Sequence, residues 1–245
     1  MTADLVTATG MVLTSMPVGD YDKRIQILTK ELGLITVFVR GAKKPQSAFS
    51  AVANPFVFGQ FDLYRGRSAY NLAKANIKDY FSDVTTSLDC VYYGSYFLEL
   101  AGYYGRENVD ASEQLNLLYI TLKALQDPRF DHDLVRVIYE LKTLVINGEY
   151  PDVFSCAICG KKEDLVALSK LRSGCLCSDC RGKESAILLQ EGALYTLQYI
   201  ITSRIEALYT FRVTDEVLEN LRNIMADLLK RYVDRKMKSL VFLES

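Results

Sequence analysis

The sequence contains a single histidine, His132, in 245 residues. A metal site built from several imidazoles, or a relay between two histidines, is therefore excluded. We expect His132 itself, at the start of a helix, to be a surface residue. Four motifs with known chemistry are also missing: the Gly-x-x-x-x-Gly-Lys-Ser/Thr phosphate loop, His-Glu-x-x-His, Gly-x-Ser-x-Gly and Gly-x-Gly-x-x-Gly. The carboxylates are scattered and form no dense group of the nuclease kind, so we expect a protein that is not an enzyme.

Long apolar runs are missing as well. None approaches the ~20 residues that a membrane helix needs. The first residues, MTADLVTATGMVLTSMP, have neither a basic start nor a long apolar core, so we expect no signal peptide. These absences favour a cytoplasmic protein with no membrane partner. In that reducing compartment, clustered cysteines bind metal or do redox chemistry more often than they form disulfides.

Positive and negative charges are nearly balanced in number but unevenly distributed along the chain. The net charge is −1, yet residues 1–80 carry ten Lys/Arg against six Asp/Glu. Residues 81–245 carry nineteen against twenty-four. Such asymmetry is typical of a polyanion-binding module joined to something else, although chance can also produce it.

The first 80 residues have the pattern of a small β-domain. Five runs rich in Val, Ile, Thr, Phe and Tyr are separated by turn residues: LVTATGMVL, RIQILTK, LITVFVRGA, FVFGQFDLYRG and AYNLAKANI. Five short strands in about 80 residues predict an oligonucleotide-binding (OB) barrel. The pattern alone does not separate it from an SH3-like barrel.

The rest of the chain has helical periodicity. Apolar residues recur at helical spacing over residues 85–104, 112–127, 132–150, 191–209 and 215–236, with Thr214 as an expected N-cap. We therefore expect an α+β multidomain protein. Its parts would be an OB-fold domain over residues 1–80, an all-α domain over 81–150 and 185–245, and a cysteine-rich insertion over 151–184.

That insertion holds five of the six cysteines. Two Cys-x-x-Cys pairs, Cys156 with Cys159 and Cys177 with Cys180, enclose seventeen residues, a spacing within the range of a four-cysteine zinc site. Each pair places two sulfurs on one tight turn, and two turns complete a tetrahedron. The fifth, Cys175, is either a substitute for Cys177 or a free thiol. We therefore predict a structural Zn²⁺ that holds together a segment too small for its own core.

Other readings of the cysteine segment remain open. A Cys-x-x-Cys pair can do redox chemistry, although neither pair has the strand–helix context typical of thioredoxin-like motifs. An iron–sulfur cluster also uses four cysteines, but the two-pair spacing is closer to a zinc ribbon. The segment could also be a short loop held by its own packing.

Basic residues cluster within the predicted barrel and alternate with aromatic ones. Single-strand binding surfaces combine cations that contact phosphates with rings on which bases stack. We take most of the aromatic residues, which include Phe38, Phe49, Phe56, Phe58 and Tyr64, as barrel core. A merely solvated rim is the alternative for the charges. By charge and strand position, the candidate DNA-binding residues are Lys23, Arg24, Arg40, Lys43, Lys44, Arg65 and Arg67.

Four segments in order resemble the RecO family of bacterial recombination and DNA repair proteins. They are GMVLTSMPVGDYDKRIQILTKELGLITVFVRGAKK, NPFVFGQFDLYRGR, ELKTLVINGEYPDVFSCAICG and SGCLCSDC. The resemblance covers nearly the whole chain. It implies an N-terminal OB barrel, a central helical domain and a zinc module. Many members lack some of the zinc cysteines, whereas this sequence has one more than a site needs.

The resemblance also implies an activity and partners. RecO-like proteins bind single- and double-stranded DNA, anneal complementary strands and work with RecR. They engage the single-stranded-DNA-binding protein SSB through the helical domain and help RecA onto coated strands, which implies a place at the nucleoid. Two other functions are weighed against this one: a zinc-stabilised thiol oxidoreductase acting through Cys-x-x-Cys, and a protein-binding scaffold without DNA affinity.

Overall fold

The structure, a computed structural model, describes residues 4–243. They form two compact units. The first contains the residues up to Leu122 together with the segment from Met237 onward, and the second contains Lys123–Lys236. The chain passes from the first unit to the second within the helix Ser112–Leu125, and it returns to the first unit near the carboxyl end of the sequence.

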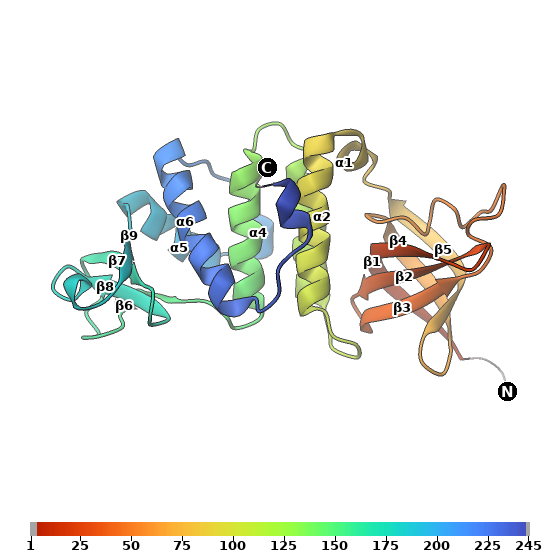
Figure 1. The fold of residues 1–245 in the computed structure, drawn as a ribbon, viewed down its shortest axis with the longest axis horizontal. Coiled ribbons are helices and arrows are strands. Elements are labelled where there is room, and N and C mark those ends of the chain that lie inside the picture. The colour runs from red at the N-terminus through yellow and green to blue at the C-terminus, as the bar shows by residue number, and fades with distance from the viewer. Residues whose placement is uncertain (1–3, 244–245) are drawn as a thin grey trace. The chain divides into compact units, whose positions relative to one another are not determined.

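The first unit begins with a closed five-stranded barrel, as predicted (Figure 1). Neighbouring strands follow the order β1-β2-β3-β5-β4, and β3 and β5 pair in parallel. This closed order is that of the OB fold, so the SH3-like alternative is excluded. The strands are β1 Leu5–Val18, β2 Asp22–Thr29, β3 Gly33–Val39, β4 Phe58–Arg65 and β5 Tyr70–Asp79.

Alternation of apolar and polar residues creates the barrel core. In β3, the buried residues Ile35, Val37 and Val39 alternate with partly exposed ones. The same period of two holds in β4, where Phe61 and Leu63 are fully buried. The β3–β4 connection adds its own apolar residues, Ala42, Val52, Ala53 and Val57, to this core.

Helices complete the first unit: α1 Ser82–Thr86, α2 Leu88–Tyr104 and α3 Ser112–Leu125. The sequence pattern predicted one helix over residues 85–104. The chain instead breaks at Ser87, whose extended backbone and side chain cap α2 by accepting from the Cys90 amide. The short helix η3, Ser239–Phe242, lies on α2, where Glu99 accepts bonds from the amides of Lys238 and Ser239.

The turn between β2 and β3 requires glycine. Gly33 has φ +68°, and a Cβ placed there would lie 2.0 Å from the carbonyl oxygen of Arg106. The turn is fixed to the α2–α3 loop because Leu34 donates to that same carbonyl and Asn108 donates to the carbonyl of Leu32. The barrel and its helices therefore meet at a point where no side chain fits.

Gly33→Ala is expected to lower the free energy of unfolding by about 3 kcal/mol, because backbone strain and a backbone clash act together. The matched control is Gly19→Ala. Gly19 has φ +56° but nothing within 4 Å of the added Cβ, so only the left-handed penalty of about 1 kcal/mol applies. Denaturant unfolding of both variants measures the difference, and equal losses would contradict the close approach at Gly33.

The second unit contains the helices α4 His132–Ile146, α5 Glu191–Thr202 and α6 Asp215–Tyr232, with the short η2 Ile205–Ala207. Thr214 caps α6, as predicted, by accepting from the Val217 amide. The helix expected over residues 191–209 ends at Thr202. There the buried Lys142 donates to three carbonyls, those of Ile200, Ile201 and Ser203, and so satisfies the carboxyl end of α5.

The cysteine segment lies between α4 and α5 and forms a small sheet that the sequence pattern did not predict. Its strands, in the order β6-β8-β7-β9, are β6 Asp152–Cys156, β7 Leu165–Ser169, β8 Gly174–Cys177 and β9 Ala186–Leu188, with the turn η1 Arg181–Lys183. We call residues 152–188 the metal module. Among the helices of the described residues, none has the length and apolarity to cross a membrane.

Candidate metal centre and nucleic-acid interface

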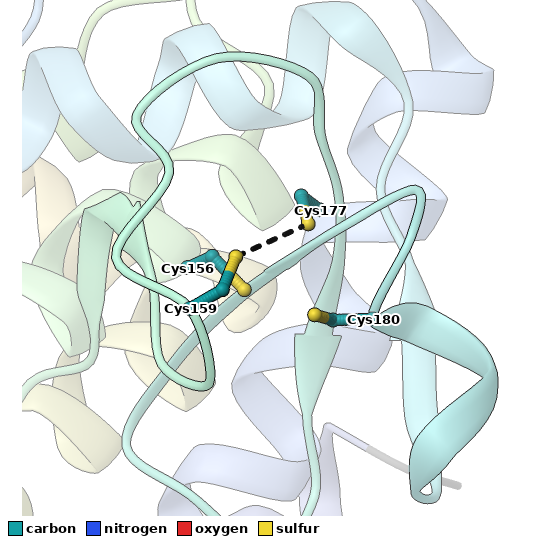
Figure 2. A group of neighbouring side chains, drawn as sticks. All are labelled: Cys156, Cys159, Cys177 and Cys180. Carbon is teal, nitrogen blue, oxygen red and sulfur yellow. Dashed lines mark hydrogen bonds between the residues drawn. The ribbon is translucent and has the colours of Figure 1, made fainter.

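Two tight turns at one end of the metal module bring four thiols together. Cys156 ends β6, Cys177 ends β8, and Cys159 and Cys180 follow them in the two turns. The four sulfurs all lie within 4.8 Å of one another (Figure 2). The Sγ atoms of Cys159 and Cys177 are 3.7 Å apart.

The backbone of each turn holds its pair in place. In the first turn, the Gly160 amide donates to the Cys156 carbonyl at 2.8 Å, and Gly160 has φ +77°, which glycine adopts without strain. The Cys156 amide in turn donates to the carbonyl of Lys161 at 2.7 Å. In the second turn, the Cys180 amide donates to the Cys177 carbonyl at 3.0 Å. The four thiols are thus positioned by the backbone itself.

The environment of the sulfurs separates their pKa values. Burial acts to raise the pKa of Cys156, but the amides of Cys159, Cys177 and Ile158 point at its sulfur and lower the pKa to about 6. Burial and the neighbouring thiols raise the pKa of Cys180 to about 12. A cation bound among such closely placed sulfurs would stabilise their thiolate forms.

The geometry fits a tetrahedral ion. Bonds of about 2.3 Å from four sulfurs to one Zn²⁺ imply sulfur–sulfur edges of about 3.8 Å, close to the 3.7 Å between Cys159 and Cys177. Four thiolates leave no open position on such an ion. The group Cys156, Cys159, Cys177 and Cys180 can therefore hold a metal ion, in a closed site of the structural kind.

The fifth cysteine is not in this group. Cys175 is fully buried in β8, where it lies opposite Cys156 of β6 and Leu168 of β7. Burial, followed by the charge of Asp152, raises the pKa of Cys175 to about 12. It is thus a protonated core thiol, with the small reactivity that such thiols have.

Polar contacts fasten the metal module to the helices of the second unit, at the end away from the cysteines. Arg231 of α6 donates to the carbonyls of Ser169, Lys170 and Arg172 around the β7–β8 turn. Asp227, one helical turn earlier, holds the same guanidinium at 3.0 Å. Nothing in the sequence pattern identified Arg231, because the carbonyls that it bonds lie about 60 residues away.

Arg231→Met is expected to destabilise the second unit by about 2 kcal/mol, since carbonyls lose charge-assisted donors while the apolar stem is kept. Metal content should not change, because the four sulfurs are held by their own turns. The matched control is Lys230→Met, whose exposed side chain should cost less than about 0.5 kcal/mol. Loss of metal in the Arg231 variant would contradict this separation of anchoring from ligation.

Five of the predicted DNA-binding cations lie around one end of the barrel. Lys23 and Arg24 begin β2, and Arg40, Lys43 and Lys44 follow β3. Two hydrogen bonds join the segments: the Lys43 amide donates to the carbonyl of Tyr21, and the Gly41 amide donates to the Asp22 carboxylate. The Lys44 ammonium lies 5.6 Å from the centre of the Tyr21 ring. We call these five cations the basic end.

The other two, Arg65 and Arg67, belong to the β4–β5 hairpin. Arg65 lies opposite Tyr70, which also pairs with Val37 of β3. The hairpin is therefore next to β3, the strand that leads into the basic end. Within residues 4–243, none of the seven predicted cations forms an ion pair with a carboxylate.

The aromatic residues of the barrel separate into two classes. Phe56 is buried, Phe49 packs against the barrel core, and Phe58 makes a tilted contact with Tyr119 of α3, with ring centres 4.7 Å apart. Phe38 and Tyr64 instead occupy outward positions of β3 and β4. The expectation that most of these five are barrel core is therefore wrong: Phe49 alone among them packs against the barrel core, and Phe56 and Phe58 pack toward the helices.

Comparison with known proteins covers nearly the whole chain. The sequence profile described as "Recombination protein O N terminal" matches residues 1–81, and the one described as "Recombination protein O C terminal" matches residues 86–240. The chain is 28% identical over 239 residues to the DNA repair protein RecO of Acetivibrio thermocellus, covering 96% of this chain and 95% of that protein. It is 32% identical over 233 residues to the DNA repair protein RecO of Exiguobacterium sibiricum, covering 95% and 93%. The chain belongs to the RecO family of DNA repair and recombination proteins.

Proposed function

We propose that this RecO-family protein binds single- and double-stranded DNA through the barrel and anneals complementary strands. The observation that carries the proposal is the basic end, where four exposed cations and the partly exposed Lys23 gather from two segments without carboxylate partners among the described residues. Phosphates are the natural partners of such cations.

Annealing follows from the same charges. Two complementary strands repel each other through their phosphates, and cations that neutralise phosphates on both strands lower this repulsion. Base pairing then supplies the free energy. No nucleotide hydrolysis is needed, in keeping with a sequence that has no phosphate-binding loop. We therefore assign no catalytic residue and propose a mediator that is not an enzyme.

The partners follow from the family. The protein works with RecR, engages SSB and helps load RecA onto SSB-coated single strands in the cytoplasm, at the nucleoid. The metal is Zn²⁺, held by Cys156, Cys159, Cys177 and Cys180, and its role is structural. Two observations disfavour a thiol oxidoreductase: all four Cys-x-x-Cys sulfurs belong to one closed group, and Cys175 is buried.

A gel-shift titration with a short oligonucleotide at two salt concentrations tests the proposal. Each phosphate neutralised on a single strand contributes a slope of about −0.7 in log K against log salt, so five contacts predict about −3.5. Affinity should then fall roughly a hundredfold between about 50 and 200 mM salt. A protein that ignores oligonucleotides even in dilute buffer would instead be a scaffold for other proteins.

A further inference from the structure

The pairing of the strands places six residues in one row around the outside of the barrel. Each is the direct cross-strand partner of the next: Met16 pairs with Arg24, Arg24 with Phe38, Phe38 with Asn71, Asn71 with Tyr64, and Tyr64 with Leu5. Direct cross-strand partners point to the same face of a sheet, with Cβ atoms about 5 Å apart. We call this set the outer row.

The outer row faces solvent. Its strand neighbours Ile25, Val37 and Leu63 are fully buried, so the residues between them point outward. The Tyr64 side chain is 43% exposed and that of Met16 is 52% exposed. Phe38 is half-buried and Arg24 is exposed. Two aromatic rings thus lie within one outward-facing row, whereas Phe61 and Tyr70 of the same barrel are buried in its core.

We propose that Phe38 and Tyr64 are stacking platforms for unpaired bases of single-stranded DNA. This inference rests on the proposed function and adds a base-contacting site to the phosphate-contacting basic end. The two rings lie two strands apart, roughly 10 Å at the usual strand spacing. Asn71 lies between them with an amide that can bond to the edge of a base.

Charge complementarity identifies the occupant. Phe38 has Arg24 directly opposite and Arg40 two residues further along, while Arg65, the next residue after Tyr64, is an exposed cation at the end of β4. The Arg24 guanidinium is held against the Met16 sulfur at 3.6 Å, within the same row. Rings flanked by cations match a strand that presents bases and phosphates together. A protein partner with an apolar face would not need this flanking charge.

The outer row also distinguishes single strands from duplex. In a duplex the bases are stacked inside, so flat rings on a barrel surface gain nothing from them, whereas phosphates remain available to the cations. Phosphate contacts and base contacts therefore contribute differently to binding. The basic end binds both kinds of DNA, and the outer row favours the single strand. Phe38 and Tyr64 are specificity-determining residues in this sense.

Truncation of the rings tests the site. Phe38→Ala and Tyr64→Ala should each weaken binding to an unstructured single-stranded oligonucleotide by about tenfold, as expected for one lost base–aromatic stack. Duplex affinity should stay within about twofold, and the salt slope should not change, because no phosphate contact is removed. Tyr80→Ala is the matched control, since Tyr80 is 46% exposed but lies outside the row. Unchanged duplex affinity also shows that each variant is folded.

A second measurement does not depend on truncation. The chain contains no tryptophan, so Phe38→Trp introduces a single indole at the proposed platform. Its fluorescence should be strongly quenched by a single-stranded thymidine oligonucleotide and little by a duplex of the same length. Tyr80→Trp, as control, should respond weakly to both.

The possible outcomes separate this inference from the proposed function. If the parent protein binds no oligonucleotide, both are wrong. If it binds, but the alanine variants keep their single-strand affinity or lose single-strand and duplex affinity equally, only the stacking site is wrong. An indole at position 38 that is quenched equally by single strand and duplex would also overturn it.

Discussion

Replacing Arg40, Lys43 and Lys44 together with alanine is expected to reduce affinity for a single-stranded oligonucleotide by roughly several hundredfold at about 50 mM salt. The expectation follows from counterion release. Three lost contacts of about 0.7 each reduce the slope of log K against log salt from about −3.5 to about −1.4. Because the counterion-release contribution to affinity vanishes near 1 M salt, the loss of affinity should shrink to about thirtyfold at 200 mM. Annealing should fall with binding.

The position of these residues allows a clean comparison. All three side chains are exposed, so their removal should change the free energy of unfolding by less than about 1 kcal/mol. A variant that removes the same charge from the second unit, at Lys162, Lys170 and Lys230, is the matched control. It should stay within about threefold of the parent. Equal losses in both variants would mean that net charge, and not the basic end, controls binding.

The barrel was predictable from sequence because its signals are local. Strands β3 and β4 alternate buried with more exposed residues, and turn residues such as Gly19 and Gly66 separate strands. The helices were also predictable, apart from their ends. Those ends depend on distant groups: α5 ends where Lys142, about 60 residues earlier, meets its last carbonyls. Such contacts leave no trace in periodicity.

The candidate metal site and the candidate DNA-binding surface also differ in how far local sequence could predict them. Cysteine spacing predicted a four-sulfur group but left Cys175 and Cys177 as alternatives, because they lie two residues apart on one strand. The register of β8 against β6 and β7 separates them, and that register is a tertiary property. The outer row was not predictable, since the parallel pairing of Phe38 with Asn71 joins strands far apart in sequence.

Cys156→Ser is expected to abolish stoichiometric metal binding and to lower the free energy of unfolding of the second unit by about 5 kcal/mol or more. The reason is that a structural ion contributes its binding free energy to folding, on the order of 10 kcal/mol in isolated zinc modules. Without the Cys156 thiolate, three ligands remain, and their buried sulfurs lack a bound ion to stabilise them. Metal analysis and denaturant unfolding measure the two effects, and removal of the metal from the parent protein with a chelator should reproduce the stability loss.

The barrel provides the internal reference for this variant. Its core belongs to the first unit, so Cys156→Ser should still bind a short oligonucleotide within about threefold of the parent. Cys175→Ala is the matched control, because Cys175 is buried but outside the sulfur group. This variant should keep its metal, and its free energy of unfolding should fall by about 1 kcal/mol.

If Cys175→Ala loses the metal while Cys177→Ser keeps it, the ligand set is wrong. If Cys156→Ser stays as stable as the parent but loses a thiol-exchange activity, the cysteines serve redox chemistry, since a structural ion cannot be removed without loss of stability.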